Sequence, residues 1–273
     1  MGKVLCSSDW HGCGEVANKV LDFLKPDDEL YYLGDITDRG KDGIQLLDRI
    51  MTMPNVHYIL GNHDDMMMRS IPEIIQDIKT LGQINYANGI SYPIWFGNGG
   101  NVTYEHGLKG KTIANVRKYL DYLKECPTKM TYSSPKGHKV ILEHAGYSPF
   151  DIPHRHHDPL WDRDHFYDRW SAYEEDEEIK NTYLVHGHTP VQYLKYHYGY
   201  IDMPAFTAED YIEKRQSLQN IFKEGEKYIK PTVLRYCEGH KLDVDMCTVF
   251  SGRIALLDLD TFETIYFDKE QED

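Results

Sequence analysis

Short clusters of aspartate, histidine and asparagine recur along the first 190 residues, and each contains a glycine. They are DWHG (9–12), GDITDRG (34–40), GNHD (61–64), EHAG (143–146) and HGHTP (186–190). Carboxylate, imidazole and amide groups without a thiolate suit divalent ions such as Mn²⁺, Fe²⁺ or Zn²⁺. Glycine lets the backbone turn sharply and brings such groups close together. The clusters therefore predict a metal site.

The number of candidate ligands exceeds what one ion needs, which is about three or four protein ligands. The excess favours two metals that share a carboxylate. Two metals roughly 3.5–4 Å apart suit phosphoester hydrolysis, because they activate a hydroxide and neutralise phosphate oxygens. Any single cluster is also typical of a turn or a helix cap, but five in a row, each after an expected strand, favour the chemical interpretation.

The elements that must position these clusters alternate between strand and helix in the first third of the chain. Apolar periodicity predicts strands at 4–8, 29–34 and 55–61, with helices at 14–25 and 42–51. Such a pattern predicts parallel pairing with right-handed crossovers. Sites in these sheets gather in the loops at the carboxyl ends of the strands, which is where the clusters lie.

The rest of the chain is less regular. A helix is expected at 64–81, with Pro72 at a break or in a first turn. The other expected elements are a long loop at 85–107, a helix at 111–125, a hairpin at 129–144, a strand at 182–188, an insertion or cap at 191–240 with a helix at 208–223, and two hairpins within 247–268 that turn at 251–252 and near 260–261.

Composition narrows the classes of partner. The chain of 273 residues has a net charge of −14, which repels nucleic-acid backbones, so we expect no nucleic-acid partner. No stretch approaches the roughly 18 apolar residues of a membrane span, and the N-terminus lacks a secretory pattern, so no membrane association is expected. Five cysteines without a C-x-x-C pair favour reduced thiols in a cytoplasmic protein.

The five clusters resemble the motifs of the phosphoprotein phosphatase (PPP) branch of the calcineurin-like metallophosphoesterases, and those of bacterial and phage-type serine/threonine protein phosphatases most of all. The likeness runs from about residue 3 to 190 and resumes at 244–263. It implies an α/β fold in which two mixed β-sheets pack as a sandwich flanked by helices. The whole chain, 1–273, would then be one metallophosphoesterase domain.

The resemblance also implies a role for each motif residue. The implied metal ligands are Asp9 and His11 for the first ion, Asp35 as the bridge, and Asn62, His144 and His188 for the second ion. His186 competes with His188 for this role, but the family's glycine directly precedes the ligand, as Gly187 precedes His188. The cofactors would be two divalent ions, with Mn²⁺ favoured and Fe or Zn left open.

Further implied roles concern the phosphate and the proton. His63 would be the general acid that protonates the leaving oxygen, oriented by Asp38. Arg39 and Arg163 would clamp the phosphate with forked donors, together with Asn62. The implied reaction is in-line attack on phosphorus by a hydroxide that bridges the two metals.

Three functions follow as hypotheses. The favoured function is phosphomonoester hydrolysis on serine- or threonine-phosphorylated proteins, with phosphotyrosine also open. Pro190 supports a monoester, because diesterase relatives place a histidine there. The alternative is a dinucleoside tetraphosphate (Ap4A-type) hydrolase. The bases of its substrate would stack on an aromatic cleft formed by Trp10, Trp95, Tyr147 and Trp161. A metal-binding scaffold without turnover is disfavoured, because no expected catalytic residue is missing.

Some features carry less weight. Ser8 replaces the family's usual glycine before Asp9. A histidine cluster at 154–157 is interpreted as a solvated loop rather than a third metal site. The oligomeric state and the physiological substrate stay open, whether a phosphorylated protein or a small phosphoester.

Overall fold

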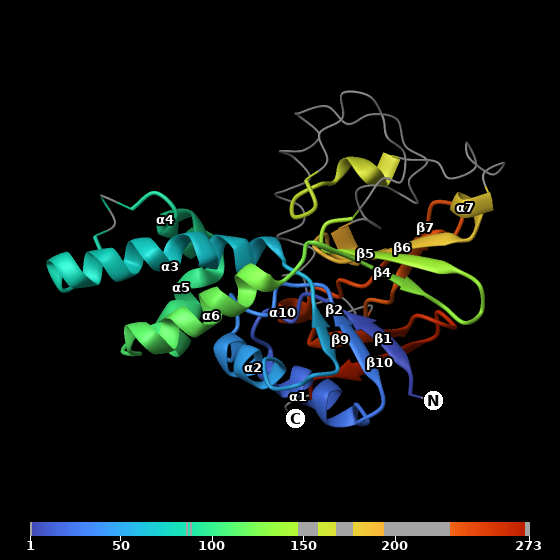
Figure 1. Cartoon of the computed structure of the whole chain (residues 1–273), viewed down its shortest axis with the longest axis horizontal. Coiled ribbons are helices and arrows are strands. Elements are labelled where there is room, and N and C mark those ends of the chain that lie inside the picture. Colours follow the sequence, from blue (N-terminus) through green and yellow to red (C-terminus); the bar gives the residue numbers. More distant parts are fainter. Residues whose placement is uncertain are drawn as a thin grey trace.

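Two five-stranded sheets form the centre of the molecule (Figure 1). The computed structural model describes residues 2–85, 87, 89–146, 158–167, 177–193 and 230–270. The strand order is β10-β9-β1-β2-β3 in the first sheet and β4-β5-β6-β8-β7 in the second. The expected α/β fold with two mixed sheets is confirmed.

The first sheet joins three parallel strands to an antiparallel pair. Its strands are β1 (Val4–Ser7), β2 (Glu29–Tyr32), β3 (Val56–Tyr58), β9 (Arg253–Asp258) and β10 (Thr264–Asp268). The parallel strands are connected through α1 (Gly14–Phe23) and α2 (Gly43–Ile50). The predicted alternation is confirmed, so the carboxyl ends of β1, β2 and β3 lie along one edge of the sheet.

The second sheet has three parallel strands with an antiparallel strand at each edge. Its strands are β4 (Lys129–Ser133), β5 (Lys139–Glu143), β6 (Thr182–His186), β7 (Leu234–Tyr236) and β8 (Lys241–Asp243). The hairpin at 129–144 is confirmed. β7 comes from the end of the segment interpreted as an insertion or cap. Most of that segment, including the helix expected at 208–223, lies outside the described residues.

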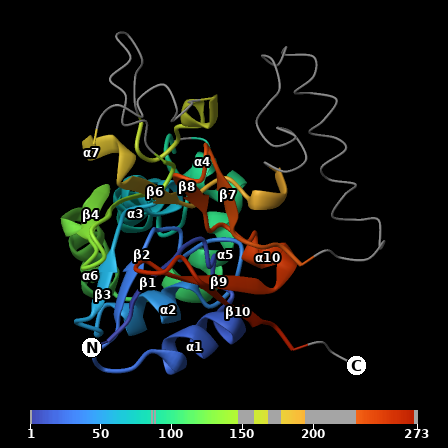
Figure 2. The same ribbon diagram turned by 90° about the vertical axis from the view of Figure 1, so that its right-hand side faces the viewer.

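Apolar side chains from both sheets meet between them. Cys6 and Leu257 of the first sheet belong to the same buried cluster as Leu142 and Val185 of the second. The other face of the first sheet is covered by α1, α2 and the helical layer that follows β3 (Figures 1 and 2). Short elements complete the described fold: a 3-10 turn η3 (Asp164–Tyr167), α7 (Glu177–Lys180) and α10 (Thr248–Ser251). Every helix in the described residues is too short or too polar to span a lipid bilayer.

The helical layer contains two corrections to the sequence predictions. Its elements are α3 (Asn62–Leu81), α4 (Tyr92–Trp95), η1 (Phe96–Gly100), α5 (Asn101–Thr103), η2 (Tyr104–Leu108) and α6 (Ile113–Glu125). Pro72 lies inside α3 and does not break it. Burial of Met67, Ile71 and Ile74 on both sides of the proline offsets its cost of about 3 kcal/mol.

The long loop expected at 85–107 is wrong for most of its length, because 92–108 forms successive helical turns. Its glycines concealed these turns. Gly99 has φ 103° and kinks the segment, while Tyr92 and Trp95 bury their rings beside it. The hairpin expected to turn at 251–252 is also wrong, since residues 248–251 form α10 and Gly252 ends it at φ 62°. The last hairpin, β9–β10, is confirmed.

Candidate active site

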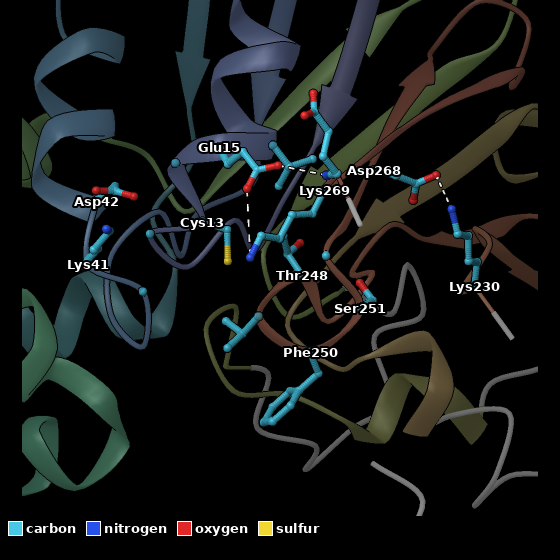
Figure 3. A pocket seen from close by; sticks show the side chains of 17 residues that line it. Cys13, Glu15, Lys41, Asp42, Lys230, Thr248, Phe250, Ser251, Asp268 and Lys269 are labelled. Carbon is cyan, nitrogen blue, oxygen red and sulfur yellow. Dashed lines mark hydrogen bonds and ion pairs between the residues drawn. The ribbon is translucent and has the colours of Figure 1, made fainter. Parts of the chain in front are cut away.

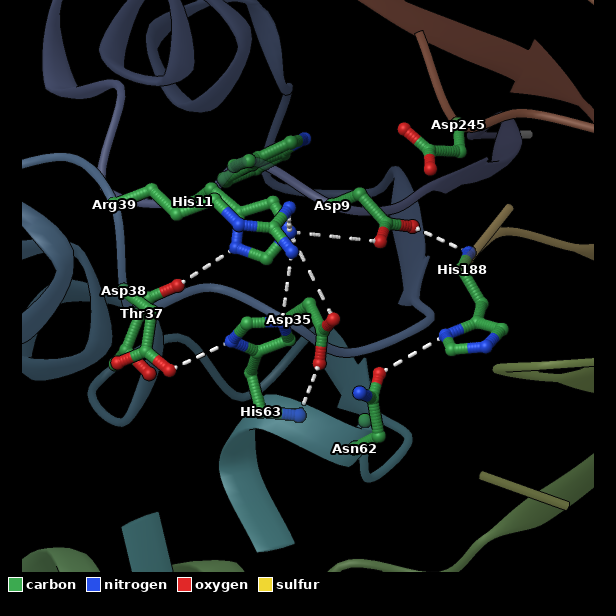
Figure 4. Close-up of polar contacts among 12 residues, drawn as sticks. Asp9, His11, Asp35, Thr37, Asp38, Arg39, Asn62, His63, His188 and Asp245 are labelled. Carbon is green, nitrogen blue, oxygen red and sulfur yellow. Dashed lines mark hydrogen bonds and ion pairs between the residues drawn. The ribbon is translucent and has the colours of Figure 1, made fainter. Parts of the chain in front are cut away.

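The predicted ligand residues lie in loops that follow strands of both sheets. Asp9 follows β1 and Asp35 follows β2, whereas Asn62 opens α3 after β3. His144 and His188 follow β5 and β6 of the second sheet. Figure 4 shows that side chains from these loops point toward one another. The site therefore forms where the carboxyl ends of the two sheets meet.

The loops place several site residues in the left-handed backbone region, where φ is positive. They are Asp9, His11, Asp35, Asp38, Arg39 and His188. Each such residue costs on the order of 1 kcal/mol or more, and the surrounding contacts must hold it. The His11 amide donates to the Asp35 carbonyl at 3.0 Å, and the His188 amide donates to Asp9 Oδ2 at 3.0 Å. The loops thus hold one another in a strained arrangement.

Two glycines permit the closest approaches. A Cβ on Gly61 would lie 2.1 Å from Asp35 Oδ1, and one on Gly187 would lie 2.2 Å from Asp9 Oδ2. Both distances are far below van der Waals contact, so any side chain there would displace a carboxylate. The motif glycines are needed because of these carboxylates.

Asp35 lies at the centre of the donor atoms. It belongs to both groups of side chains whose potential ligand atoms lie within 4.8 Å of one another, one with His11 and His63 and the other with Asp9 and His144. Its Oδ2 is 3.8 Å from His11 Nε2 and 3.4 Å from His144 Nε2. One carboxylate therefore faces two sets of donors.

A second set of donors surrounds Asn62. Its Oδ1 lies 2.8 Å from His144 Nε2 and 3.0 Å from His188 Nδ1. Backbone carbonyls fix the ring orientations, because His144 Nδ1 lies 2.6 Å from the Leu33 oxygen and His11 Nδ1 lies 2.9 Å from the Thr37 oxygen. Each Nδ1–H is taken up by a carbonyl, so each Nε2 faces the cluster, as a metal-binding imidazole requires.

The electrostatics of the cluster suit cations. Burial raises the pKa of Asp9, and the neighbouring charge of Asp35 raises it further. Burial lowers the pKa of His144, but Asp35 and Asp9 outweigh this effect and raise it to about 10. His188 Nε2 is buried without a hydrogen-bond partner. Oxygen and nitrogen donors 2.8–3.9 Å apart have about the spacing of neighbouring ligands on one ion. The residues therefore fit a pair of divalent ions.

The proton and phosphate side adjoins the first donor group. His63 Nδ1 donates to Asp38 Oδ2 at 2.7 Å, and both side chains are buried. The Arg39 guanidinium contacts the imidazole rings of both His11 and His63. Its Nη1 lies 2.7 Å from His11 Nε2, and its Nη2 lies 2.9 Å from His63 Nε2. A guanidinium cation thus already faces the atom of His11 that points into the cluster.

Arg163 lies at the edge of this arrangement. Its side chain is exposed, and its Nε donates to Thr189 Oγ1 at 3.1 Å. Burial lowers the pKa of His188, and the charge of Arg163 lowers it further. The structure thus brings eight of the other nine predicted site residues into one buried cluster, with the exposed Arg39 lying over it and Arg163 beside it.

His186 is kept out of the cluster by its own partners. Its Nε2 lies 2.7 Å from the Tyr236 hydroxyl, and its Nδ1 lies 3.0 Å from the Gly187 oxygen. The Tyr236 hydroxyl also lies 3.3 Å from Nδ1 of His165, whose Nε2 lies 2.9 Å from the Ala145 oxygen. This chain of contacts supports the loops on which His144 and His188 are carried.

Sequence reasoning assigned no role to Asp64, although it quoted the residue within GNHD. Asp64 Oδ2 accepts from the amides of Gly61 and Asp35 and from the Tyr58 hydroxyl, each at 3.0 Å. Burial and the charge of Asp35 raise its pKa to about 7. The signal was present in the sequence, because an acidic residue three positions after a helix's N-cap is a capping pattern.

Asp245 carried no such signal. It is buried after β8 and accepts from the Cys247 amide at 2.7 Å. Figure 4 shows its carboxylate facing Asp9, and after burial this neighbour is the main cause of its raised pKa. Its nearness to the site depends on the second sheet, which local sequence does not reveal.

The expected aromatic cleft is reduced. Trp10 and Trp95 are both 0% exposed, so the prediction that they line a cleft is wrong. Trp161 is 42% exposed, and its ring centroid lies 5.8 Å from that of His188. Tyr147 and the histidines at 154–157 lie outside the described residues.

A cavity of about 950 Å³ lies between residues 12–16, the turn at 40–42 and residues 248–252 (Figure 3). It is bordered by the start of α1, the turn at 40–42 and α10, and none of the predicted site residues lines it. Its charged groups include an ion pair of Lys230 with Asp268 at 2.8 Å. The cavity is therefore separate from the donor cluster.

Comparisons with known proteins agree with this geometry. The family model described as calcineurin-like phosphoesterase matches residues 2–211. A solved structure of a provisionally assigned diadenosine tetraphosphatase is similar at TM-score 0.51 and 15% identity, covering 99% of this chain and 95% of that one. A serine/threonine protein phosphatase from Saccharomyces cerevisiae, with similarity to human phosphatase PP5, has TM-score 0.52 and 11% identity, covering 100% of this chain and 81% of that one.

These structural similarities show the fold alone, and the search of curated proteins gives no match. The family match covers most of the chain, and the donor cluster provides the dinuclear divalent metal site of a metal-dependent phosphoesterase. The chain belongs to the calcineurin-like phosphoesterase family.

Proposed function

We propose that this chain hydrolyses phosphomonoesters, and that serine- and threonine-phosphorylated proteins are its substrates. One observation carries the proposal. Asp35 joins two groups of potential metal donors; in one of them His63 pairs with the Asp38 carboxylate, and Arg39 lies against His63 and His11. Such a site combines charge neutralisation, phosphate binding and proton donation within a few ångströms.

The proposed ligand sets are Asp9, His11 and Asp35 for one ion, and Asp35, Asn62, His144 and His188 for the other. This division is supported by the 3.9 Å between His11 Nε2 and Asp9 Oδ1 and by the contacts of Asn62 Oδ1 with the two other histidines. Two divalent ions in this site would activate water and neutralise phosphate oxygens. Mn²⁺ is the ion we expect to support activity, because every donor is oxygen or imidazole nitrogen.

Arg39 binds phosphate in this proposal. Its two terminal nitrogens lie 2.7 Å and 2.9 Å from imidazole nitrogens, so the fork is already aimed across the site. A guanidinium pairs more strongly with phosphate oxygens than with neutral imidazole, because both partners are then charged. Phosphate binding would therefore turn Arg39 away from His63 Nε2 and leave that atom to hold a proton.

His63 donates that proton to the leaving oxygen. Asp38 Oδ2 lies 2.7 Å from His63 Nδ1, which fixes the orientation of the ring. A positioned general acid accelerates such a step by about 10²–10⁴-fold. Arg163 completes the phosphate site from the rim, where its side chain is exposed.

A protein substrate is favoured over a dinucleotide because the expected base-stacking surface is reduced. Two of its four aromatic residues are fully buried, and among the described ones only Trp161 offers an exposed ring. Pro190 stands where diesterase relatives carry a histidine, which favours a monoester. Dinucleoside tetraphosphate hydrolysis is the second candidate, since the same donors and Arg39 would serve it.

The test measures hydrolysis with added Mn²⁺, as phosphate released from a phosphothreonine peptide and as adenine nucleotides released from diadenosine tetraphosphate at equal concentration, because cleavage of the tetraphosphate yields nucleotides and no free phosphate. We expect faster release from the peptide. Faster release from the dinucleotide would replace the proposed substrate but keep the site. No release from either would overturn the proposal, provided that bound Mn²⁺ is demonstrated in the same sample.

A further inference from the structure

Asp38 receives more hydrogen bonds than its pairing with His63 requires. Trp95 Nε1 lies 2.9 Å from Oδ1 and 2.8 Å from Oδ2 of this carboxylate. Thr103 Oγ1 donates to Oδ1 at 2.9 Å and accepts from the Asp38 amide at 2.7 Å. All four side chains are at least 97% buried, so water does not compete for these contacts. Both carboxylate oxygens are therefore fixed in place.

The two additional donors come from one segment, residues 92–108, which we call the support segment. Trp95 ends α4 and Thr103 ends α5. The same segment reaches the neighbouring arginine, because the Arg39 amide donates to the Gly99 carbonyl at 3.1 Å. A Cβ on Gly100 would lie 2.3 Å from the Trp95 indole, so the segment packs closely around this ring.

We propose that Trp95 and Thr103 are positioning residues for proton transfer to the leaving group, acting through Asp38 on His63. The indole N–H and the hydroxyl prevent the carboxylate from rotating. The lone pair of Oδ2 that these donors leave unoccupied then points at His63 Nδ1. This contact orients the His63 ring so that Nε2 faces the leaving oxygen. This inference deepens the proposed function and rests on it.

These residues serve the hydrolysis of a phosphomonoester by water. The oxygen of water forms a new bond to phosphorus, and the bond from phosphorus to the leaving oxygen breaks with its electron pair on that oxygen. His63 Nε2 supplies a proton to the leaving oxygen, and the proton lost by the attacking water restores the balance. The products are an alcohol or phenol and inorganic phosphate.

The dependence of rate on the leaving group separates positioning from mere packing. Phenolate is a poor leaving group and needs the proton, whereas p-nitrophenolate is stable without it. A defect in His63 positioning slows phenyl phosphate selectively. A packing defect that distorts the whole site slows both substrates and also alters KM.

The experiment measures kcat and KM for both substrates with Mn²⁺, in the wild-type chain and in Trp95→Phe, Thr103→Val and Thr103→Ser. Phenylalanine keeps a ring but loses the N–H, and valine keeps the shape of threonine but loses the hydroxyl. We expect kcat for phenyl phosphate to fall by about 10–100-fold in Trp95→Phe and Thr103→Val, the usual effect of losing an outer partner of a site residue. For p-nitrophenyl phosphate we expect a fall of less than about threefold, with KM unchanged, as removal of general-acid help alone implies.

Thr103→Ser retains a hydroxyl and should recover most of the phenyl phosphate rate. Thr248→Val is the matched control, because Thr248 is buried and its hydroxyl donates to the Arg253 carbonyl instead. A double variant with His63→Gln should be no slower on phenyl phosphate than His63→Gln itself, since residues that act in one path are not additive. If Trp95→Phe does not fold, the comparison of Thr103→Val with Thr103→Ser still tests the positioning role.

Equal losses on both substrates, unchanged rates, or additive losses with His63→Gln would overturn the inference while leaving the proposed function in place. A wild-type chain with bound Mn²⁺ that hydrolyses neither substrate would overturn the proposed function, and the inference with it.

Discussion

The ligand loops and the support segment contribute to the same site by different means. The ligand loops, residues 9–12, 34–36, 61–62, 144–146 and 187–189, follow strands and carry strained backbones and closely approached glycines. The support segment, 92–108, is helical, and in the described contacts its role is to hold Asp38 and the Arg39 backbone. The loops hold the groups that would contact metals, whereas the segment fixes the Asp38 carboxylate and the backbone of Arg39.

Residues that bind metal or phosphate are therefore easier to recognise in a sequence than the residues that position them. A ligand must be one of a few residue types beside a glycine, so the loops form dense motifs. A support needs one N–H or hydroxyl at the right place, which many residues supply. Experiments that alter one region at a time test whether the two regions act in these different ways.

The largest effect is expected at Asp35, the carboxylate shared by both donor groups. Asp35→Asn removes the charge that both ions would share. We expect phosphate release to fall by about 10³-fold or more, well beyond the 10–100-fold loss typical of an outer partner of a ligand. Turnover of p-nitrophenyl phosphate and metal content by elemental analysis check this together.

The matched control is Asp48→Asn, because Asp48 is half-exposed and pairs with Lys118 at 2.5 Å on the surface. It should retain metal and rate. If Asp35→Asn also retained its metal content and its rate, the ligand loops would not hold the metals as proposed.

Gly61→Ala is expected to have the next largest effect. The new Cβ would meet Asp35 Oδ1 at 2.1 Å and push the carboxylate aside without altering any donor. A displacement of about 1 Å at a reacting site costs roughly 10²-fold in rate, and we expect a fall of that size in kcat.

Gly97→Ala is the corresponding change in the support segment, where a Cβ meets nothing within 4 Å. We expect its rate to match that of wild type. Equal losses in the two variants would mean that close approach to Asp35 does not explain the motif glycine.

A smaller effect is expected at Tyr236, which supports the loops of the second sheet. Its hydroxyl lies 2.7 Å from His186 Nε2 and 3.3 Å from His165 Nδ1, and it does not reach the donor cluster directly. Tyr236→Phe should weaken Mn²⁺ binding by about 10-fold, the lower end of the outer-partner range. A Mn²⁺ titration of activity checks this, and kcat at saturating Mn²⁺ should change little. An unchanged midpoint would show that the ligand loops of the second sheet need no such support.

The smallest effect is expected outside both regions, at Asp268 on β10. Hydrogen bonds from Arg253 lower its pKa to about 2, against a small opposing effect of burial. Because the folded pKa is depressed, this pair stabilises the fold above the unfolded pKa of about 3.9, and its contribution is lost as the pH falls toward 2. The pair is partly exposed, so we expect Asp268→Asn to cost only about 1 kcal/mol at pH 7.

Urea unfolding of Asp268→Asn and wild type at pH 7 and pH 3 tests this, and the difference should shrink at pH 3. Turnover at pH 7 should be unchanged. A difference that grew on acidification would contradict the sign of the pKa shift.

The three parallel strands of the first sheet and the ligand loops could be predicted well from the sequence, because both are encoded locally; the pairing of β9 with β1 could not. Alternating apolar segments gave β1, β2 and β3, and each motif follows its strand directly. Asp35, the shared carboxylate, stands out because its neighbours are Gly34 and the Asp38–Arg39 pair.

The parts that could not be predicted depend on contacts between distant residues. Trp95 lies 57 residues from Asp38, and Thr103 lies 65 residues away, so no local pattern links them. The glycines around Gly99 favour a loop by composition, whereas the burial of the Tyr92 and Trp95 rings stabilises the helical turns. The neighbours of Trp10 in the sequence are proposed ligands, which favours a place in the cleft. Its ring packs in the core instead, and no local pattern indicates this.

The hydrogen bond from the His188 amide to Asp9 joins residues that are 179 positions apart. Contacts at such separation form late, because most of the chain must be ordered before they can close. A chain emerging from the ribosome can pair β1 with β2 early, yet it holds only part of the proposed ligand set until residue 188 has been made and β6 has docked beside β5. The proposed donor set is therefore complete only when the two sheets have come together, and a fragment that ends before residue 188 should lack part of it.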